Sequence, residues 1–328
     1  MLRYVIKRIL YMIPTLFGLS LIAFMIIQLP PGDYVTSMIA SMQDSGANVD
    51  PRQVERLREI YGFNDPIWVQ YFKWISGILL RGDFGYSFEW NRPVAELIWE
   101  RMGSTLAISI ASLLFVWAVA LPIGIYSAVR RHTVGDYFFT LVGFVGLAVP
   151  NFILALALMY FSYRYFGQSV GGLFSPEYVE APWSWGKFVD LLGHLWIPII
   201  VIGTSGTAAL IRVLRANLSD ELHKPYVITA KAKGLPGYKV VLKYPVRIAL
   251  NPFVSAIGWV LPELISGVTI TAIVLNLPTA GPLLLRSLIS QDMYLAGSFI
   301  LLMGVLTLIG MLVSDLLLAL LDPRIRFT

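Results

Sequence analysis

Long apolar stretches alternate with polar segments along the whole chain. A helix needs about 20 mostly apolar residues to cross the hydrocarbon core of a bilayer. Stretches of this length occur at 9–29, 105–129, 137–163, 194–214, 252–275 and 295–320. The pattern therefore predicts an all-α integral membrane protein with six transmembrane helices and both termini on the same side of the membrane.

The distribution of lysine and arginine predicts the orientation of these spans. Basic residues gather before the first span, at 130–131, throughout 215–250 and after the last span. All four regions fall on one side of the predicted membrane, and short loops rich in Lys and Arg remain cytoplasmic. We therefore expect cytoplasmic termini and three parts: 1–29, the N-terminal tail and first helix; 30–104, an external insertion; and 105–328, a five-helix core containing the cytoplasmic loop 215–250.

Two helix-start signals divide the external insertion. Asp50-Pro51 precedes a short amphipathic pattern that Gly62 can end, and Asp65-Pro66 precedes a second helical pattern. An N-cap residue followed by proline is typical of helix starts. The second pattern places aromatic and apolar residues along one side, as interfacial helices do, at Trp68, Tyr71, Phe72 and Ile75. We expect this helix to lie on the outer membrane surface.

Composition supports the membrane interpretation and excludes some chemistry. Apolar residues make up 57% of the chain and charged residues only 14%, against about 25% charged residues in soluble domains. The net charge of +5 belongs mainly to the predicted inner face, where anionic lipid attracts Lys and Arg, and gives no reason to infer nucleic-acid binding. Because the chain has no cysteine, disulfides and thiol catalysis are excluded.

The cytoplasmic loop contains the sharpest local pattern. Pro225 can begin a helix that places Val227, Ala230 and Gly234 on one side, and Gly234 together with Pro236 can end it. A second short helix can follow over 239–244. A small helix with an alanine and glycine face permits close approach of another protein, and its flanking lysines can pair with acidic groups there.

At this point the chain resembles the dipeptide/oligopeptide-type permeases of binding-protein-dependent ABC importers. The resemblance rests first on the loop sequence Tyr226-Val227-Ile228-Thr229-Ala230-Lys231-Ala232-Lys233-Gly234-Leu235. It covers nearly the whole chain, with further matches in order at Arg3-Tyr4-Val5-Ile6-Lys7-Arg8, Pro31-Gly32-Asp33, Gly82-Asp83-Phe84-Gly85-Tyr86-Ser87 and Leu321-Asp322-Pro323-Arg324-Ile325-Arg326.

The resemblance implies the type I ABC importer permease fold, with an external helical insertion after the first helix. It implies a coupling helix seated in a groove on an ATPase subunit, with Ala230 and Gly234 as close-packing positions. The residues implied in coupling are Tyr226, Val227, Thr229, Ala230, Lys231, Ala232, Lys233, Gly234 and Leu235. The implied partners are a homologous second permease, two ATP-binding subunits that hold ATP and Mg, an external substrate-binding protein and membrane lipid.

The chain departs from the family pattern at two places. Ile228 stands where the wider importer motif has glutamate, which excludes a salt bridge from that position. After the fifth span, Ala272 replaces the glutamate of a Val-Glu-Thr-Val-Phe pattern, and Pro278-Thr279-Ala280-Gly281 replaces Pro-Gly-Leu-Gly. Because relatives of this architecture also carry oligosaccharides and nickel chelates, peptides and oligosaccharides both remain open as cargo.

Other chemistry finds little support in the sequence. No phosphate-binding loop of the form G-x-x-x-x-G-K-[ST] occurs, and His132, His194 and His223 lie apart without a metal-binding motif. We therefore expect a non-catalytic subunit that binds no cofactor or metal itself. The alternative class is a secondary transporter or channel working without an ATPase, although the internal repeats typical of secondary transporters are missing.

One acidic residue within the predicted spans is a candidate for the transport pathway. Ionisable groups inside a membrane are costly and are often functional. Glu263 follows Pro262 in the fifth span and can line the pathway. The alternative, which the sequence alone favours, is that Glu263 hydrogen-bonds to a neighbouring helix or to backbone freed around Pro262.

Overall fold

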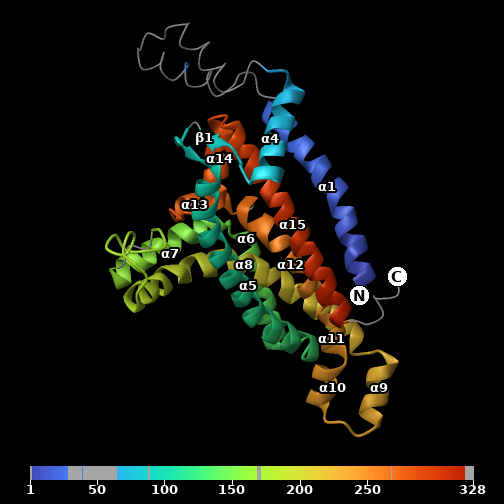
Figure 1. Cartoon of the computed structure of the whole chain (residues 1–328). Helices are drawn as coiled ribbons and strands as arrows, with labels where there is room; N and C mark the ends of the chain where they lie inside the picture. Colours follow the sequence, from blue (N-terminus) through green and yellow to red (C-terminus); the bar gives the residue numbers. More distant parts are fainter. Residues whose placement is uncertain are drawn as a thin grey trace. The chain divides into compact units, whose positions relative to one another are not determined.

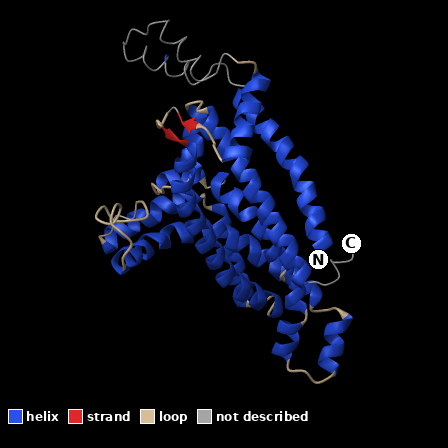
Figure 2. Cartoon of the chain, in the orientation of Figure 1, coloured by secondary structure: helices blue, strands red, loops and turns tan. Residues whose placement is uncertain are grey.

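The computed structural model describes residues 2–28, 39, 65–87, 89–167, 171–266 and 268–321. Helices account for most of this part, with one small two-stranded antiparallel sheet (Figure 2). In chain order (Figure 1) the elements are α1 (Leu2–Gln28), α4 (Ile67–Arg81), β1 (Tyr86–Ser87), β2 (Arg92–Pro93), α5 (Val94–Val129), α6 (Val134–Ala148), α7 (Asn151–Phe166), α8 (Trp185–Glu221), α9 (Pro225–Ala232), α10 (Gly237–Lys243), α11 (Pro245–Ala249), α12 (Asn251–Ser266), α13 (Thr269–Val274), α14 (Ala280–Ile289) and α15 (Met293–Leu321).

Among the described residues, five helices are long and apolar enough to cross a membrane, or up to six if one bent pair counts as a single span. The bent pair is α6 and α7, which meet at 100° and take the place of the single third span, 137–163, that the sequence predicts. Val149 is extended and Pro150 precedes α7 directly. This is the conformation that proline imposes on the residue before it, so the helix ends there.

The fifth predicted span, 252–275, is also divided. It is shared between α12 and α13. In this region the stretch that is long and apolar enough to cross a membrane is Gly237–Gly258. It begins earlier in the chain than the span that the sequence predicts. The first, second, fourth and sixth predicted spans fall within α1, α5, α8 and α15 respectively, apart from position 29, which lies outside the described residues.

The chain forms two compact units, and their boundaries differ from those of the three parts expected from the sequence. Apart from Met1, one unit comprises 104–278 and 309–328, and the other comprises 2–103 and 279–308. Residues 279–308, assigned from sequence to the five-helix core, therefore belong to the same unit as α1 and α4.

Helix α8 forms the centre of the first unit, 104–278 with 309–328. Helices α6, α7, α11 and α12 all contact it. Ile197 and Val201 of α8 lie in one buried cluster, and Leu214 and Leu218 lie in a second that includes Phe253 of α12. Burying such side chains contributes about 1.5–3 kcal/mol each in soluble proteins, whereas in lipid the gain comes from tight packing.

The second unit, 2–103 with 279–308, is held together by aromatic packing. Phe24 of α1 lies 5.5 Å from Tyr71 and 6.0 Å from Trp74 of α4, measured between ring centroids. The hydroxyls of Ser20 and Tyr71 are 2.8 Å apart. Helix α4 follows Asp65-Pro66 as predicted, but its aromatic residues divide between two environments, because Tyr71 is buried whereas Trp68 and Phe72 are exposed. The other predicted external helix, 50–62, lies outside the described residues.

Candidate functional site

The predicted coupling segment forms a pair of short helices, α9 and α10, that lie side by side (Figure 1). Pro225 occupies the first turn of α9, where its missing N–H costs nothing. Val227 and Ala230 of α9 are buried against Val240 of α10, with Tyr244 packed on the same cluster. This small apolar cluster holds the two helices together.

The burial of Ala230 corrects one sequence-based expectation. Ala230 was expected to be a close-packing position for an ATPase, but only 6% of its surface is exposed because α10 covers it. Val227 is fully buried for the same reason. Of the nine residues expected in coupling, these two support the helix pair from inside, and the other seven are exposed at Tyr226, Thr229, Lys231, Ala232, Lys233, Gly234 and Leu235.

The exposed side of α9 also carries a residue that the sequence analysis did not include. Ile228 is 61% exposed beside Thr229. Ile228 therefore belongs to the surface of α9 that remains open to a partner, together with the seven exposed residues named above. The signal in the sequence is that Ile228 stands where the wider importer motif has glutamate, which excludes an ion pair from this position.

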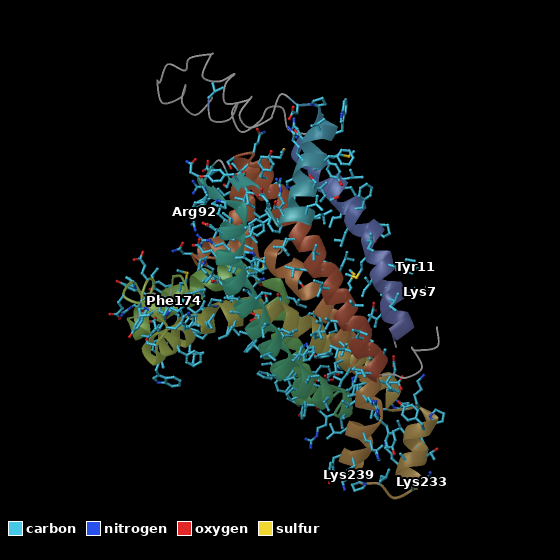
Figure 3. The ribbon with its side chains drawn as sticks, viewed as in Figure 1. Lys7, Tyr11, Arg92, Phe174, Lys233 and Lys239 are labelled. Atoms are coloured by element: carbon cyan, nitrogen blue, oxygen red, sulfur yellow. The ribbon has the colours of Figure 1, made fainter. Side chains whose placement is uncertain are left out.

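Gly234 has a conformational role at the end of α9. Its φ is +77°, and a Cβ added there would meet no atom within 4 Å. The left-handed conformation lets the chain turn from α9 toward α10. Lys233 and Lys239 lie near this turn, and their side chains extend from the end of the helix pair (Figure 3). The glycine is therefore needed for the turn itself, whether or not a partner protein packs against it.

The helix pair is anchored to the membrane helices next to it. The Tyr226 hydroxyl donates a hydrogen bond to the carboxylate of Glu221, the last residue of α8. Beyond α10, Arg247 of α11 donates from Nε to the Leu321 carbonyl of α15 at 3.0 Å. These contacts link α9 to the end of α8, and α11 to the end of α15.

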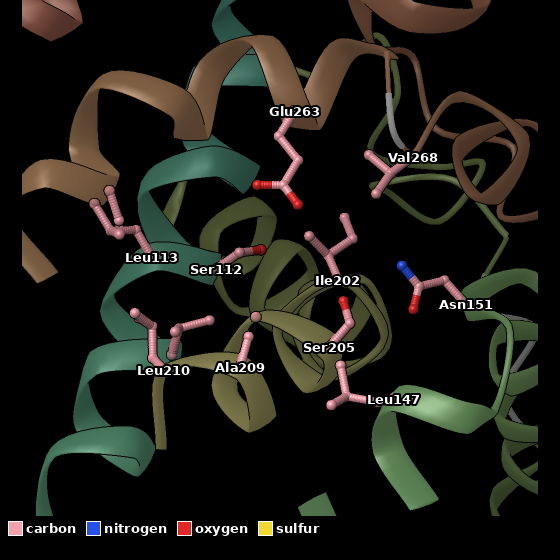
Figure 4. Close-up of a pocket in the computed structure, with 13 residues that line it drawn as sticks. Ser112, Leu113, Leu147, Asn151, Ile202, Ser205, Ala209, Leu210, Glu263 and Val268 are labelled. Atoms are coloured by element: carbon pink, nitrogen blue, oxygen red, sulfur yellow. The ribbon is translucent and has the colours of Figure 1, made fainter. Parts of the chain in front are cut away.

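A cavity of about 460 Å³ lies among α5, α7, α8 and α12 in the first unit. Its polar lining comes from Ser112, Asn151, Ser205 and Glu263 (Figure 4). The rest of its lining is apolar or glycine, with Leu113, Val116, Leu147, Ile202, Gly206, Ala209, Leu210, Ala256 and Val268. A mostly apolar cavity with a few polar groups is the usual form of a small-molecule site.

Glu263 is the charged member of this lining. Its carboxylate points into the cavity, between Ser112 and Ile202 (Figure 4). Within the described part of the chain it makes no hydrogen bond, and its side chain is exposed. Glu263 therefore lies on the wall of the cavity, and its role in a pathway stays a prediction. Within the same described part, no group of three or more His, Asp or Glu side chains could hold a metal ion.

Comparison with known proteins identifies the family. Residues 120–327 match the family described as the binding-protein-dependent transport system inner membrane component, and residues 1–109 match its N-terminal family. The chain therefore belongs to the inner membrane components of binding-protein-dependent transport systems. It is a multi-pass permease subunit with the all-α fold of type I ABC importers.

Relatives of the same length extend the similarity over the whole chain. The oligopeptide transport system permease protein AppB of Bacillus subtilis (strain 168) is 34% identical over 100% of both chains. A putative peptide permease protein, BOV_A0351, of Brucella ovis is 32% identical over 100% of both. The dipeptide transport system permease protein DppB of Escherichia coli (strain K12) is 29% identical over 99% of both.

Proposed function

We propose that this chain forms half of the translocation pathway of an ATP-driven peptide importer and transmits the movement of a partner ATPase through α9. The observation that carries the proposal is the exposed side of α9, where Ile228 and Thr229 lie at the surface of a helix pair that is linked to α8. An exposed apolar side chain on a rigidly attached helix suits a seat on another protein.

The remaining parts of the importer follow from this role. A homologous permease supplies the other half of the pathway, and two ATP-binding subunits hold ATP and Mg and close upon them. An external binding protein delivers the cargo, and this chain performs no covalent chemistry. The basic segment 215–250 contains α9 and α10, so the ATPases and both termini are placed on the cytoplasmic side by the positive-inside rule.

Peptides are the favoured cargo over oligosaccharides. The relatives are named as permeases for oligopeptides or dipeptides. The cavity beside Glu263 adds a physical reason, because a carboxylate in a mostly apolar cavity attracts the ammonium group of a peptide. An oligosaccharide has no such charge, so a single carboxylate there would give it no comparable advantage.

The experiment begins with co-expression of the tagged chain with its neighbouring genes and gentle purification of the complex. Ile228→Asp places a charge on the proposed seat, and Ile228→Leu keeps the side chain apolar at the same position. We expect Ile228→Asp to lose the ATPase subunits and ATP-driven uptake, and Ile228→Leu to retain both. Monodisperse elution of each variant in detergent checks that the chain still folds.

Reconstitution into proteoliposomes tests the energy source and the cargo. Uptake should require hydrolysable ATP and the binding protein, and should proceed with short peptides rather than oligosaccharides. A chain that purifies alone and transports without ATP would instead be a secondary transporter or channel. If Ile228→Asp transported and co-purified like the wild type, the assignment of α9 to coupling would be wrong.

A further inference from the structure

A second cleft lies where α5, α8 and α10 approach the turn at 130–132. Its volume is about 970 Å³, near the upper end of the roughly 300–1,000 Å³ typical of ligand pockets. The cleft is separate from the cavity around Glu263, since the two share no lining residue. It shares only Lys231 with the residues expected in coupling, and none with the cavity around Glu263.

One side of the cleft is apolar and belongs largely to the last turns of α5. Pro122, Ile125, Ala128 and Val129 line it from α5, and Leu222, Val241 and Leu242 line it from the α8–α10 region. Val129 and Leu242 are exposed. This wall belongs to the last turns of α5, an apolar helix that is long enough to cross a membrane and ends at Val129.

The cleft also has a basic rim. Arg130, Arg131, His132, His223 and Lys231 line it, and all five are exposed. The cleft lining contains no aspartate or glutamate among the described residues. Two nearby carboxylates have other partners, because Asp136 binds Arg215 and Glu221 accepts the Tyr226 hydroxyl. The positive charge at the rim is therefore not neutralised from within the cleft.

Ser219 and His223 both line the cleft, and the Nδ1 of His223 is already hydrogen-bonded within the chain. The His223 Nδ1 lies 2.8 Å from the Ser219 carbonyl oxygen, so Nδ1 carries a hydrogen and donates there. Ser219 lines the cleft, and its buried hydroxyl has no hydrogen-bond partner in the described part of the chain. A buried hydroxyl without a partner is costly and indicates that another group satisfies it.

We propose that this cleft binds an anionic phospholipid, with its phosphate among Arg130, Arg131 and Lys231 and its acyl chains along α5. Basic residues beside an apolar wall at the end of an apolar helix match the two parts of such a lipid. Arginine side chains extend from an apolar helix end toward the headgroups. The bound lipid would fill the space between the membrane helix α5 and the helix α10 that supports α9.

The test measures lipid bound to the purified full chain in detergent, by native mass spectrometry with phosphatidylglycerol or phosphatidylcholine added. The test variant is Arg130→Gln with Arg131→Gln. The control is Lys239→Gln with Lys243→Gln, which removes the same charge from exposed residues of α10 that do not line the cleft. Elution profiles and helical circular dichroism confirm that both variants fold.

We expect the wild type and the control to retain phosphatidylglycerol in preference to phosphatidylcholine. The Arg variant should bind phosphatidylglycerol about 30-fold more weakly, since each basic residue near anionic lipid contributes about 1 kcal/mol and every 1.4 kcal/mol is tenfold. Soluble glycerol phosphate should not displace the lipid, because it lacks the acyl chains that α5 contacts.

Three results would overturn the proposal. Equal losses in the Arg variant and the Lys control would indicate general charge attraction rather than a site. Full displacement by glycerol phosphate or inorganic phosphate would indicate a site for a free phosphate group. If the assembled importer excluded the lipid while the Arg variant lost its ATPase subunits, the cleft would be a protein contact instead.

Discussion

Arg215 binds Asp136 with two parallel hydrogen bonds, although 79 residues separate them in the sequence. Nε donates to Oδ1 and Nη2 donates to Oδ2, each at 2.7 Å, and the Asp136 side chain is fully buried. The backbone N–H of His132 donates to the same carboxylate at 2.9 Å. The pair fixes the start of α6 and the preceding turn to α8, a few residues before α8 ends and α9 begins.

Replacing Asp136 with alanine should destabilise the isolated chain. The substitution leaves the Arg215 guanidinium in a mostly buried position without its carboxylate, and breaking a buried pair costs about 3–5 kcal/mol. We expect about 3 kcal/mol, because 27% of the Arg215 side chain is exposed and water replaces part of the interaction. Thermal unfolding in detergent, followed by circular dichroism, measures the loss.

The matched control for this pair replaces both partners together. Asp136→Leu with Arg215→Met removes both charges and keeps apolar volume, so it should be more stable than Asp136→Ala alone. If Asp136→Ala unfolded at the wild-type temperature, the ion pair would contribute nothing to holding α6 on α8.

Helices α12 and α15 approach each other closely at Gly258 and Gly310. A Cβ added at Gly258 would lie 3.2 Å from the Met311 Cα, and one added at Gly310 would lie 3.2 Å from the Gly258 Cα. Small residues permit such contacts between membrane helices, where packing rather than hydrophobicity drives association. The Ser314 hydroxyl adds a hydrogen bond of 2.9 Å to the Val254 carbonyl.

Gly258→Leu should therefore separate α12 from α15 and lower stability by about 1–3 kcal/mol, the usual cost of overpacking. Gly193→Leu provides the control, because Gly193 lies in α8 with open space where its Cβ would be. The two unfolding temperatures, measured in the same detergent, give the comparison. Equal unfolding temperatures would mean that the helix contact tolerates a side chain.

Asp292 supports the start of α15 from a buried position. The Ser87 hydroxyl donates to its Oδ2 at 2.5 Å, and the Leu295 N–H donates to its Oδ1 at 3.3 Å as in an N-cap. Burial raises the pKa of the Asp292 carboxyl above its usual range, although these hydrogen bonds favour the charged form. Because this pKa is higher in the folded state than in the unfolded state, folding favours the protonated form of the Asp292 carboxyl.

The pH dependence follows from the sign of this shift. The contribution of Asp292 to stability is fully present below its unfolded pKa of about 3.9 and is lost as pH rises through the higher folded pKa. Asp292→Asn keeps an N-cap oxygen but does not titrate. The stability of this variant should therefore increase relative to that of the wild type as the pH rises from the unfolded to the folded pKa of Asp292. Parallel unfolding-temperature profiles of the two proteins against pH would show no divergence if the carboxyl titrated normally.

The turn at Gly234 offers a test of the coupling helix that is independent of Ile228. Gly234→Trp places a large side chain at an exposed position and strains the left-handed backbone, so we expect loss of the ATPase subunits with membrane insertion intact. Gly234→Asn is the control, because asparagine tolerates this conformation and is smaller. Normal co-purification and uptake by Gly234→Trp would remove the turn from the proposed contact.

The sequence predicted the helices whose signals are local. Apolar length was enough to place most spans, and Pro225 with Gly234 was enough to bound the coupling helix. The sequence did not predict the sharp bend at Pro150. Pro122 and Pro198 also lie in predicted spans, yet each lies inside a continuous helix, α5 or α8. Proline permits a bend, and packing around α8 decides which proline produces one.

Long-range contacts explain the remaining differences. The pairing of Asp136 with Arg215 has no local pattern, since the two residues belong to helices far apart in sequence. The face of Ala230 was correctly identified as a contact face, but periodicity does not indicate which element covers it, and α10 does so within the chain. Likewise, the sequence favoured a bridging role for Glu263, whereas the structure places it on a cavity wall.

Glu263→Gln tests whether this cavity belongs to the transport pathway. The substitution keeps the shape of the side chain and removes its charge, so folding and ATPase association should be unchanged. Uptake of peptides through the proposed ammonium contact should fall by about tenfold or more, since a hydrogen bond to a charged group contributes about 1.5–3 kcal/mol. N-acetylated peptides that the system still accepts are the matched control, because they lack the ammonium and should lose little. Equal loss for free and acetylated peptides would indicate a structural role for Glu263, and no loss for either would place it outside the pathway.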